Sequence, residues 1–200
     1  MKVQAIEKFS LNELYHRCYQ TSGMCEENDM SARMTIEFYY LDEDGEEHVV
    51  GTVEIIRIPS SLRKFNNRML GDHYDTLTWM DDESQELSDV ALVMKNALSD
   101  VSADMYDALF ESDLYYISRV HVEKQFRGCG IGSNIMYKLY RIVQMCAHEE
   151  SPVLLLRAFP TEETFMTEEW KYNHKRLLTW YEKVGFQCID DDVDVMVQMK

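Results

Sequence analysis

A glycine-rich turn between a strand-like run and a helical pattern limits the fold of this chain more than any other feature. The run Leu114–Val122 is rich in β-branched and aromatic residues, which is typical of a buried strand. Three glycines follow at positions 128, 130 and 132. Apolar residues then recur at helical spacing, at Ile131, Ile135, Leu139, Ile142, Val143 and Cys146. The sequence therefore predicts a strand, a glycine turn and a helix in direct succession.

Such a turn is suited to bind a phosphate group. Glycine has no Cβ and adopts positive φ easily, so consecutive backbone N–H groups can converge on one anion. The helix that follows adds the positive end of its dipole. Arg127 supplies a full positive charge at the rim. The donors are expected to be the backbone amides of Gly128, Cys129, Gly130, Ile131, Gly132 and Ser133.

Two common phosphate-binding motifs do not fit. A Walker-type nucleotide site requires Gly-Lys-Ser/Thr after the glycines, and that tripeptide is absent. The first-glycine spacing of a dinucleotide-binding fingerprint is also missing.

One motif resembles the acyl-CoA pyrophosphate loop of the GCN5-related N-acetyltransferases (GNAT). It reads Arg127-x-x-Gly130-x-Gly132 and is preceded by Val120-x-Val122 and Phe126. A second block at 177–186 resembles the later helix of that family, which ends in Tyr-Glu-Lys-x-Gly-Phe. The two blocks stand in the family's order. The resemblance covers about 114–200 well and the earlier part of the chain only loosely.

The resemblance implies an α/β (α+β) fold, in which a mixed, mostly antiparallel sheet splays at the acyl-CoA site and carries flanking helices. The β-rich runs 33–41 and 49–58 flank an acidic turn and predict a hairpin that fits the second and third strands of such a sheet. We expect one acetyltransferase domain over 1–200 with an acidic helical insertion at about 59–113.

Other elements follow from apolar spacing and turn residues. In chain order they are a short helix at 10–19, helices in the insertion around 87–98 and 105–109, a strand at 153–159, a polar connection at 161–170, a helix at 172–184 ended by Gly185, and a closing hairpin formed by 186–189 and 193–199.

The insertion is strongly acidic, because residues 81–113 hold ten acidic side chains against Lys95 alone. The favoured interpretation is a solvated helix exterior, since charged outer faces are the norm. The alternative is a lid whose field attracts a positively charged acceptor. Both interpretations predict amphipathic helices.

Composition limits the partners. A formal net charge of -16 argues against nucleic acid, whose binding requires clustered Lys and Arg, and favours cationic substrates. The five cysteines form no zinc-type spacing, so we expect reduced thiols and no metal site. No apolar run approaches the ~20 residues of a membrane-spanning helix. We expect a cytoplasmic protein with no membrane partner, for which a homodimer is possible.

The resemblance also implies roles for single residues. Backbone groups of Val120, His121 and Val122 would pair with the pantetheine arm, and an amide there would donate to the thioester oxygen. Tyr181 matches the tyrosine that protonates the departing sulfur; the alternative is a buried aromatic on an apolar helix face. Asn173 is a candidate contact to the cofactor arm, although strict spacing selects His174.

The general base is not apparent in the sequence. Family members carry Glu or His at positions that match Tyr116 and Ser118, and neither of these side chains is a good base near pH 7. Another family position matches Leu155. His121 should face away from Ser118, because side chains alternate along a strand. A water-mediated route and a carboxylate such as Glu54 both stay open.

The predicted function is transfer of the acetyl group from acetyl-CoA to a primary amine of a cationic small molecule or peptide. The alternative is an acyl-CoA-binding regulatory or interaction module with little or no turnover, which the missing base favours.

Overall fold

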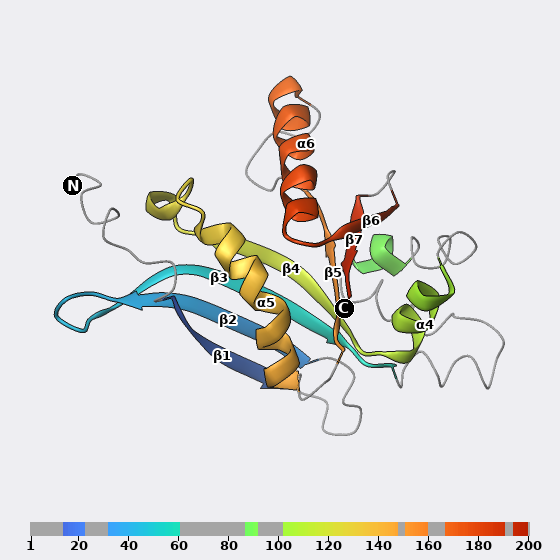
Figure 1. Cartoon of the computed structure of the whole chain (residues 1–200), viewed down its shortest axis with the longest axis horizontal. Coiled ribbons are helices and arrows are strands. Elements are labelled where there is room, and N and C mark those ends of the chain that lie inside the picture. Colours follow the sequence, from blue (N-terminus) through green and yellow to red (C-terminus); the bar gives the residue numbers. More distant parts are fainter. Residues whose placement is uncertain are drawn as a thin grey trace. The chain divides into compact units, whose positions relative to one another are not determined.

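The strands follow the order β1-β2-β3-β4-β5-β7-β6 in a seven-stranded, mostly antiparallel sheet in which β4 and β5 are parallel (Figure 1). The computed structural model describes residues 14–22, 32–60, 87–91, 102–147, 151–159, 167–190 and 194–199. The strands are β1 (Tyr15–Ser22), β2 (Ala32–Leu41), β3 (Glu47–Ile58), β4 (Leu114–Val122), β5 (Val153–Arg157), β6 (Gln187–Asp190) and β7 (Val195–Gln198). The helices are α4 (Ala103–Glu111), α5 (Ile131–Ala147), α6 (Glu168–Lys183) and the 3-10 turn η3 (Lys124–Phe126).

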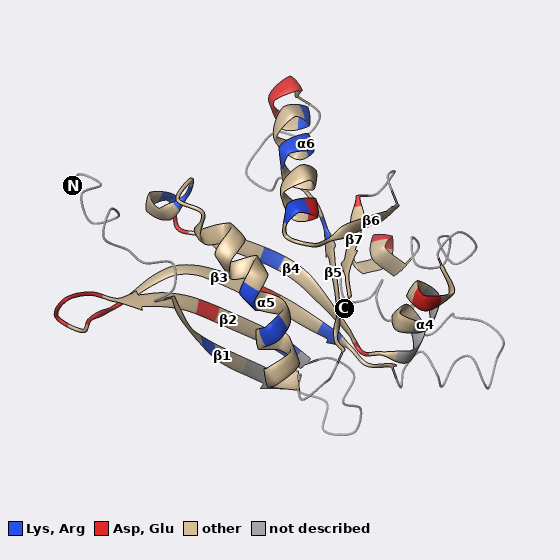
Figure 2. Ribbon diagram, viewed as in Figure 1, with Lys and Arg blue, Asp and Glu red and all other residues tan. Residues whose placement is uncertain are grey.

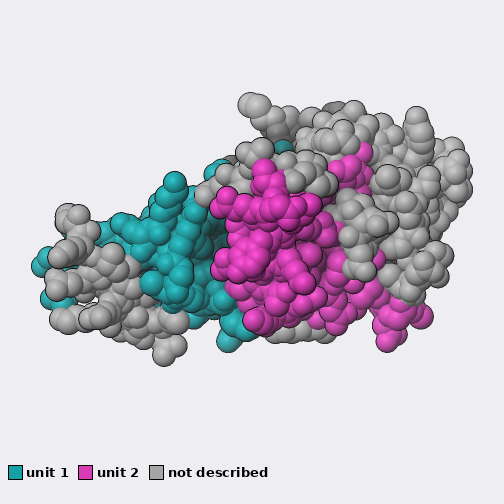
Figure 3. All heavy atoms as spheres, turned by 90° about the horizontal axis from the view of Figure 1, so that it is seen from above, with its two compact units in different colours: residues 1–57, 117–150 teal, residues 58–116, 151–200 magenta. Residues whose placement is uncertain are grey.

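The chain divides into two compact units (Figure 3). Unit 1 consists of residues 1–57 and 117–150, and unit 2 of residues 58–116 and 151–200. The strand β4 contributes its first residues to unit 2 and the rest to unit 1. The expectation of one domain over the whole chain stays a prediction.

The predicted hairpin in unit 1 is confirmed. β2 pairs antiparallel with β3 from Leu41↔Glu47 to Ala32↔Arg57, with a bulge between Phe38 and Tyr39. The connecting turn closes through backbone hydrogen bonds from Gly45 N–H to the Asp42 carbonyl and from Asp42 N–H to the Glu46 carbonyl, both 3.0 Å. Gly45 has φ +80°, a conformation that favours glycine.

The predicted helix at 10–19 is wrong where the structure describes it. Residues Tyr15–Ser22 form strand β1, which pairs antiparallel with β2, and residues 10–13 lie outside the described ranges. The ring of Tyr15 stacks on Tyr39 at 5.7 Å, and the Arg17 guanidinium bonds Glu37 at 3.1 Å. These cross-strand pairs stabilise a strand whose apolar spacing also fitted a helix.

Helix α5 covers one face of the β1–β3 strands and confirms the helix predicted after the glycine turn. Its apolar side is buried at Ile131, Ile135, Met136, Leu139, Tyr140, Ile142 and Val143. The Lys138 ammonium donates to the Leu14 carbonyl at 3.2 Å. Burying each large side chain contributes roughly 1.5–3 kcal/mol, so this face supplies much of the core of unit 1.

Four of the five cysteines lie in the described ranges, and none of these four forms a disulfide: Cys18, Cys129, Cys146 and Cys188. Cys18 on β1 and Cys146 on α5 share a hydrogen bond. Burial, together with that bond, raises the pKa of the Cys18 thiol to about 12. Cys25 lies outside the described ranges.

In unit 2, the predicted strand at 153–159 is confirmed as β5, and the predicted closing hairpin as β6 and β7. β5 pairs antiparallel with β7, and β7 with β6. Every residue of β7 is buried.

Two parts of the insertion are helical, as predicted. Residues 87–91 form a helical turn with Leu87, Val90 and Ala91 buried, and α4 buries Leu109. Asp89 forms an ion pair with Arg157 of β5. At least one acidic residue of the insertion therefore serves packing within unit 2. Residues 61–86 and 92–101 lie outside the described ranges, so both interpretations of the acidic insertion stay open.

Helix α6 begins earlier than predicted, at Glu168 rather than near Tyr172, so residues 168–170 of the expected polar connection are helical. Residues 161–166 of that connection lie outside the described ranges. The Thr167 hydroxyl caps the helix by accepting from Trp170 N–H at 3.0 Å, and two glutamates in the first turn favour the helix dipole. Among the helices of the described ranges, none combines the length and apolar content needed to cross a membrane.

The C-terminal end of α6 depends on Gly185, which has φ +103°. The Gln198 amide of β7 donates to the Val184 carbonyl at 3.2 Å, and a Cβ on Gly185 would lie 2.8 Å from that amide nitrogen. The end of α6 therefore lies so close to β7 that a residue other than glycine at position 185 would require the Gln198 side chain to move.

We expect Gly185→Ala to destabilise the protein more than Gly45→Ala. Both alanines meet the cost of positive φ, about 1–2 kcal/mol, but a Cβ on Gly45 meets nothing within 4 Å. Displacing the Gln198 amide adds roughly 1 kcal/mol. Urea unfolding of the two variants measures the difference, and equal losses would contradict the contact.

Candidate active site

The glycine turn has the open geometry that the sequence predicts. Residues 127–130 are exposed, and Gly128 and Gly130 both have φ +80°. A Cβ on Gly128 would meet nothing within 4 Å, so space next to the backbone is open there. The Asn134 N–H donates to the Gly130 carbonyl at 3.1 Å and starts the helical ladder of α5. The backbone amides before Asn134 stand at a helix N-terminus, where a helix has no carbonyls of its own to pair them.

The turn is held from its N-terminal side. Phe126 is buried, and its N–H donates to the Glu123 carbonyl at 2.8 Å. Arg127 Nε donates to the Val122 carbonyl at 2.8 Å. Arg127 was predicted to supply charge at the rim, and the structure shows that its side chain also braces the end of β4 against the turn.

Burial falls along β4 toward the turn. Residues 114–117 are buried, whereas Val120, His121 and Val122 are half-buried. Glu123 N–H donates to the Val50 carbonyl at 2.9 Å, and a Cβ on Gly51 would lie 2.5 Å from the His121 carbonyl oxygen. The close approach of β3 thus fixes the end of β4. The sequence did not single out Gly51, because a glycine inside a strand pattern does not say which backbone approaches it.

Tyr181 lies on α6 with its side chain turned into unit 2. It is 7% exposed, and its ring packs against Trp180 at 4.7 Å and edge-on against Phe186 at 5.7 Å. Burial raises the pKa of the Tyr181 phenol above its usual value, so the hydroxyl keeps its proton throughout the neutral range. A protonated phenol is what a general acid requires.

The positions considered for a base hold side chains with other partners or surroundings. Tyr116 is fully buried in unit 2, and so is Leu155. In unit 1, the Ser118 hydroxyl donates to the Glu54 carbonyl at 3.3 Å, while the Glu54 carboxylate lies 3.7 Å from Arg119. The catalytic roles of Tyr116 and Ser118 stay predictions.

Of the two neighbouring candidates on α6, His174 is the one turned inward. Its Nε2 lies 3.0 Å from Asp194 Oδ2, and its ring stacks on Trp170 at 4.6 Å. Asn173 is half-buried and accepts from Arg176 at 3.4 Å. The pairing with Asp194, which has φ +56° before β7, was not apparent in the sequence because the partners lie far apart along the chain. The cofactor role of Asn173 stays a prediction.

The mixed, mostly antiparallel sheet and the strand, glycine turn and helix in succession agree with the fold that the motifs predicted. No protein-family model matches this sequence, and no curated protein matches it. A solved structure described as "The crystal structure of KacTA-DNA complex" is similar at a TM-score of 0.40 and 10% identity, covering 87% of this chain and 70% of that chain. A similarity this low carries no argument about function.

We expect Gly51→Ala to destabilise the protein by about 1–3 kcal/mol, because the added Cβ forces β3 away from the His121 carbonyl. Gly45→Ala is the matched control, since it adds the same methyl group where nothing lies within 4 Å. Denaturant unfolding measures both. A Gly51→Ala variant no less stable than the control would show that the strands do not approach this closely.

Alkaline pH should reduce stability through Tyr181. Because the pKa is raised in the folded protein, the unfolded phenol ionises first, and stability present below about pH 10 is lost as pH rises above it. Tyr181→Phe should show a smaller loss than wild type between about pH 8 and 11. Tyr172→Phe, which alters a phenol 65% exposed, should behave as wild type. Equal losses in all three proteins would contradict the assignment.

Proposed function

We propose that this protein is an acyl-CoA-dependent N-acyltransferase that transfers the acetyl group of acetyl-CoA to a primary amine. The observation that carries the proposal is the open glycine turn, in which two glycines at φ +80° lie between the end of β4 and the N-terminus of α5. A backbone of this shape at a helix N-terminus suits a diphosphate.

In this proposal the backbone amides of residues 128–133 bind the pyrophosphate of coenzyme A, and Arg127 adds positive charge at the rim. The half-buried end of β4 at Val120, His121 and Val122 lies directly before the turn, so its backbone is the nearest partner along the chain for the pantetheine arm. The glycines act through their shape, because any Cβ would stand between the amides and the phosphates.

The reaction needs one bond formed and one broken. The neutral amine attacks the thioester carbonyl carbon, the C–S bond breaks, and the Tyr181 phenol gives its proton to the departing thiolate. The amine loses its surplus proton to water. The Tyr181 phenol holds its proton at neutral pH, as this role requires, although burial raises its pKa and so makes it a weaker acid than a free phenol. The tyrosine is restored by the proton that the amine released.

The acceptor is proposed to be cationic, either a small polyamine or a basic peptide. The chain carries 36 acidic side chains against 20 Lys and Arg, and acidic residues gather at the β2–β3 turn and at the start of α6 in Figure 2. A negative protein field raises the local concentration of positive substrates and their rate of association.

Calorimetric titration with acetyl-CoA tests the cofactor, and release of free thiol with a panel of monoamines, polyamines and lysine peptides tests the transfer. Tyr181→Phe should bind acetyl-CoA as wild type while kcat falls by about 100-fold. Gly130→Val should weaken acetyl-CoA binding by about tenfold or more, because a β-branched residue does not readily adopt the φ of +80° that the turn has at this position. Absence of acetyl-CoA binding to the wild type would refute the proposal.

The second candidate is an acyl-CoA-binding module with little or no turnover. It is favoured by the side chains at the base positions, since Ser118 bonds the Glu54 carbonyl while Tyr116 and Leu155 are fully buried. Tight acetyl-CoA binding with no thiol release across the amine panel would select it over the enzyme.

A further inference from the structure

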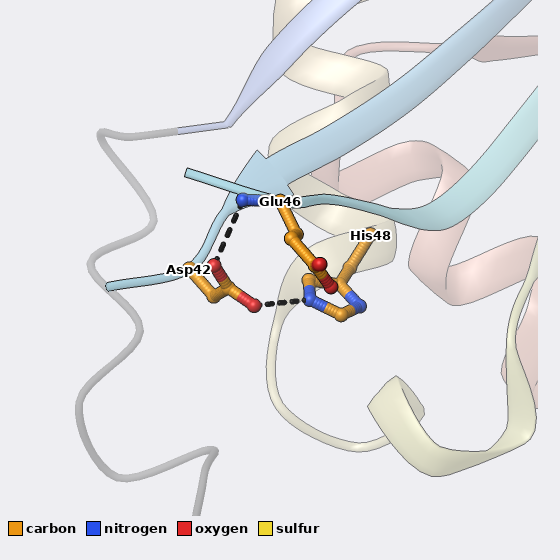
Figure 4. Close-up of side chains that lie close together, drawn as sticks. All are labelled: Asp42, Glu46 and His48. Atoms are coloured by element: carbon orange, nitrogen blue, oxygen red, sulfur yellow. Dashed lines mark hydrogen bonds and ion pairs between the residues drawn. The ribbon is translucent and has the colours of Figure 1, made fainter. Parts of the chain in front are cut away.

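The turn between β2 and β3 brings together three donors of the kind that bind metal ions: Asp42, Glu46 and His48. One ligand atom from each lies within 4.8 Å of the others (Figure 4). Asp42 precedes the turn, Glu46 ends it and His48 is on β3, so the hairpin itself assembles the set. The cluster is composed of two carboxylates and one imidazole.

Two of the three donors are oriented by contacts with the hairpin. Asp42 Oδ1 accepts the backbone N–H groups of Asp44 and Glu46 at 3.0 and 2.9 Å, which directs Oδ2 toward His48 Nε2 at 2.7 Å. The His48 ring stacks on Tyr40 at 5.1 Å with an interplanar angle of 23°. Asp42 and His48 are therefore held in place before an ion binds, which reduces the conformational entropy that their side chains lose on binding.

The chemistry of the donors selects a class of ion. An imidazole nitrogen with carboxylate oxygens suits Zn²⁺ and neighbouring first-row divalent ions, whereas Ca²⁺ takes six to eight oxygen ligands. The turn is also negatively charged, since five of the six residues 42–47 are acidic. Glu47 forms an ion pair with Arg17 at 2.8 Å. Water can complete a tetrahedral site on the exposed side of the turn.

We infer that Asp42, Glu46 and His48 bind one divalent transition-metal ion of the Zn²⁺ class. The ion takes the place of the hydrogen bond between Asp42 Oδ2 and His48 Nε2, because Nε2 must offer its lone pair for the metal–nitrogen bond to form. The sequence pointed away from a metal because its cysteines and histidines lack zinc spacing. This set uses carboxylates instead, and only the hairpin register places His48 beside Asp42.

The site is linked to the glycine turn by packing. Tyr40, which stacks on His48, also meets Phe126 edge-on at 5.9 Å, and Phe126 is the residue before Arg127. A metal ion here cross-links the hairpin whose aromatic side chain supports that turn. The inference does not depend on acyl transfer, because every donor belongs to the hairpin.

Calorimetric titration of the untagged, chelator-treated full chain with ZnCl₂ tests the inference. Wild type should bind one ion per chain. His48→Gln and Glu46→Gln should each weaken binding by about tenfold or more, because each removes a ligand. The matched control is Asp44→Asn, which removes one charge from the same turn but keeps the backbone N–H that Asp42 accepts; its affinity should stay within about twofold of wild type.

Circular dichroism confirms that each variant is folded. Saturation with Zn²⁺ should raise the unfolding temperature of wild type and of Asp44→Asn, but not that of His48→Gln. Loss of affinity in Asp44→Asn as large as in Glu46→Gln would overturn the site in favour of diffuse charge attraction. Zn²⁺ binding that is unchanged in His48→Gln would overturn it as well.

Discussion

The close approach of β3 to β4 is the constraint on which the candidate site depends. Gly51 lets the His121 carbonyl come within a distance that a side chain would block, and Glu123 N–H then bonds the Val50 carbonyl. These contacts fix where β4 ends. Phe126 and Arg127 connect the end of β4 to the glycine turn, so the geometry of the proposed phosphate site follows from backbone packing more than from any charged side chain.

Unit 2 holds its helix α6 to β7 in two places. The Gln198 amide bonds the Val184 carbonyl at one end, and His174 meets Asp194 nearer the other. Between them, the inward side of the helix carries Tyr181, whose burial keeps the phenol protonated. The position of a proposed general acid therefore depends also on Gln198, His174 and Asp194, which lie outside the family-like motif but within the same unit.

Much of this could be predicted from local pattern. The limits of β4 agree with its apolar run, and α5 begins at Ile131, between Gly130 and Gly132, because hydrophobic periodicity and glycines indicate such elements directly. β1 was predicted wrongly because apolar residues at 11, 14, 15 and 18 fit a helix, whereas the strand is stabilised by Tyr39 and Glu37 of β2. The apolar spacing of one segment does not show which other strand it pairs with.

The sequence by itself determined the order of strand, glycine turn and helix, and with it the fold class and the type of ligand proposed. The order of these elements depends on residues close together in the chain, because hydrophobic spacing and the backbone freedom of glycine act over a few residues. Only the tertiary structure decided that Gly51 is required by a carbonyl on another strand, that His174 faces Asp194, and that Asp42 and His48 share one side of a hairpin. The first two are contacts between residues far apart in the chain, and the third is a contact across a hairpin turn. The energy of each exists only once the chain has folded.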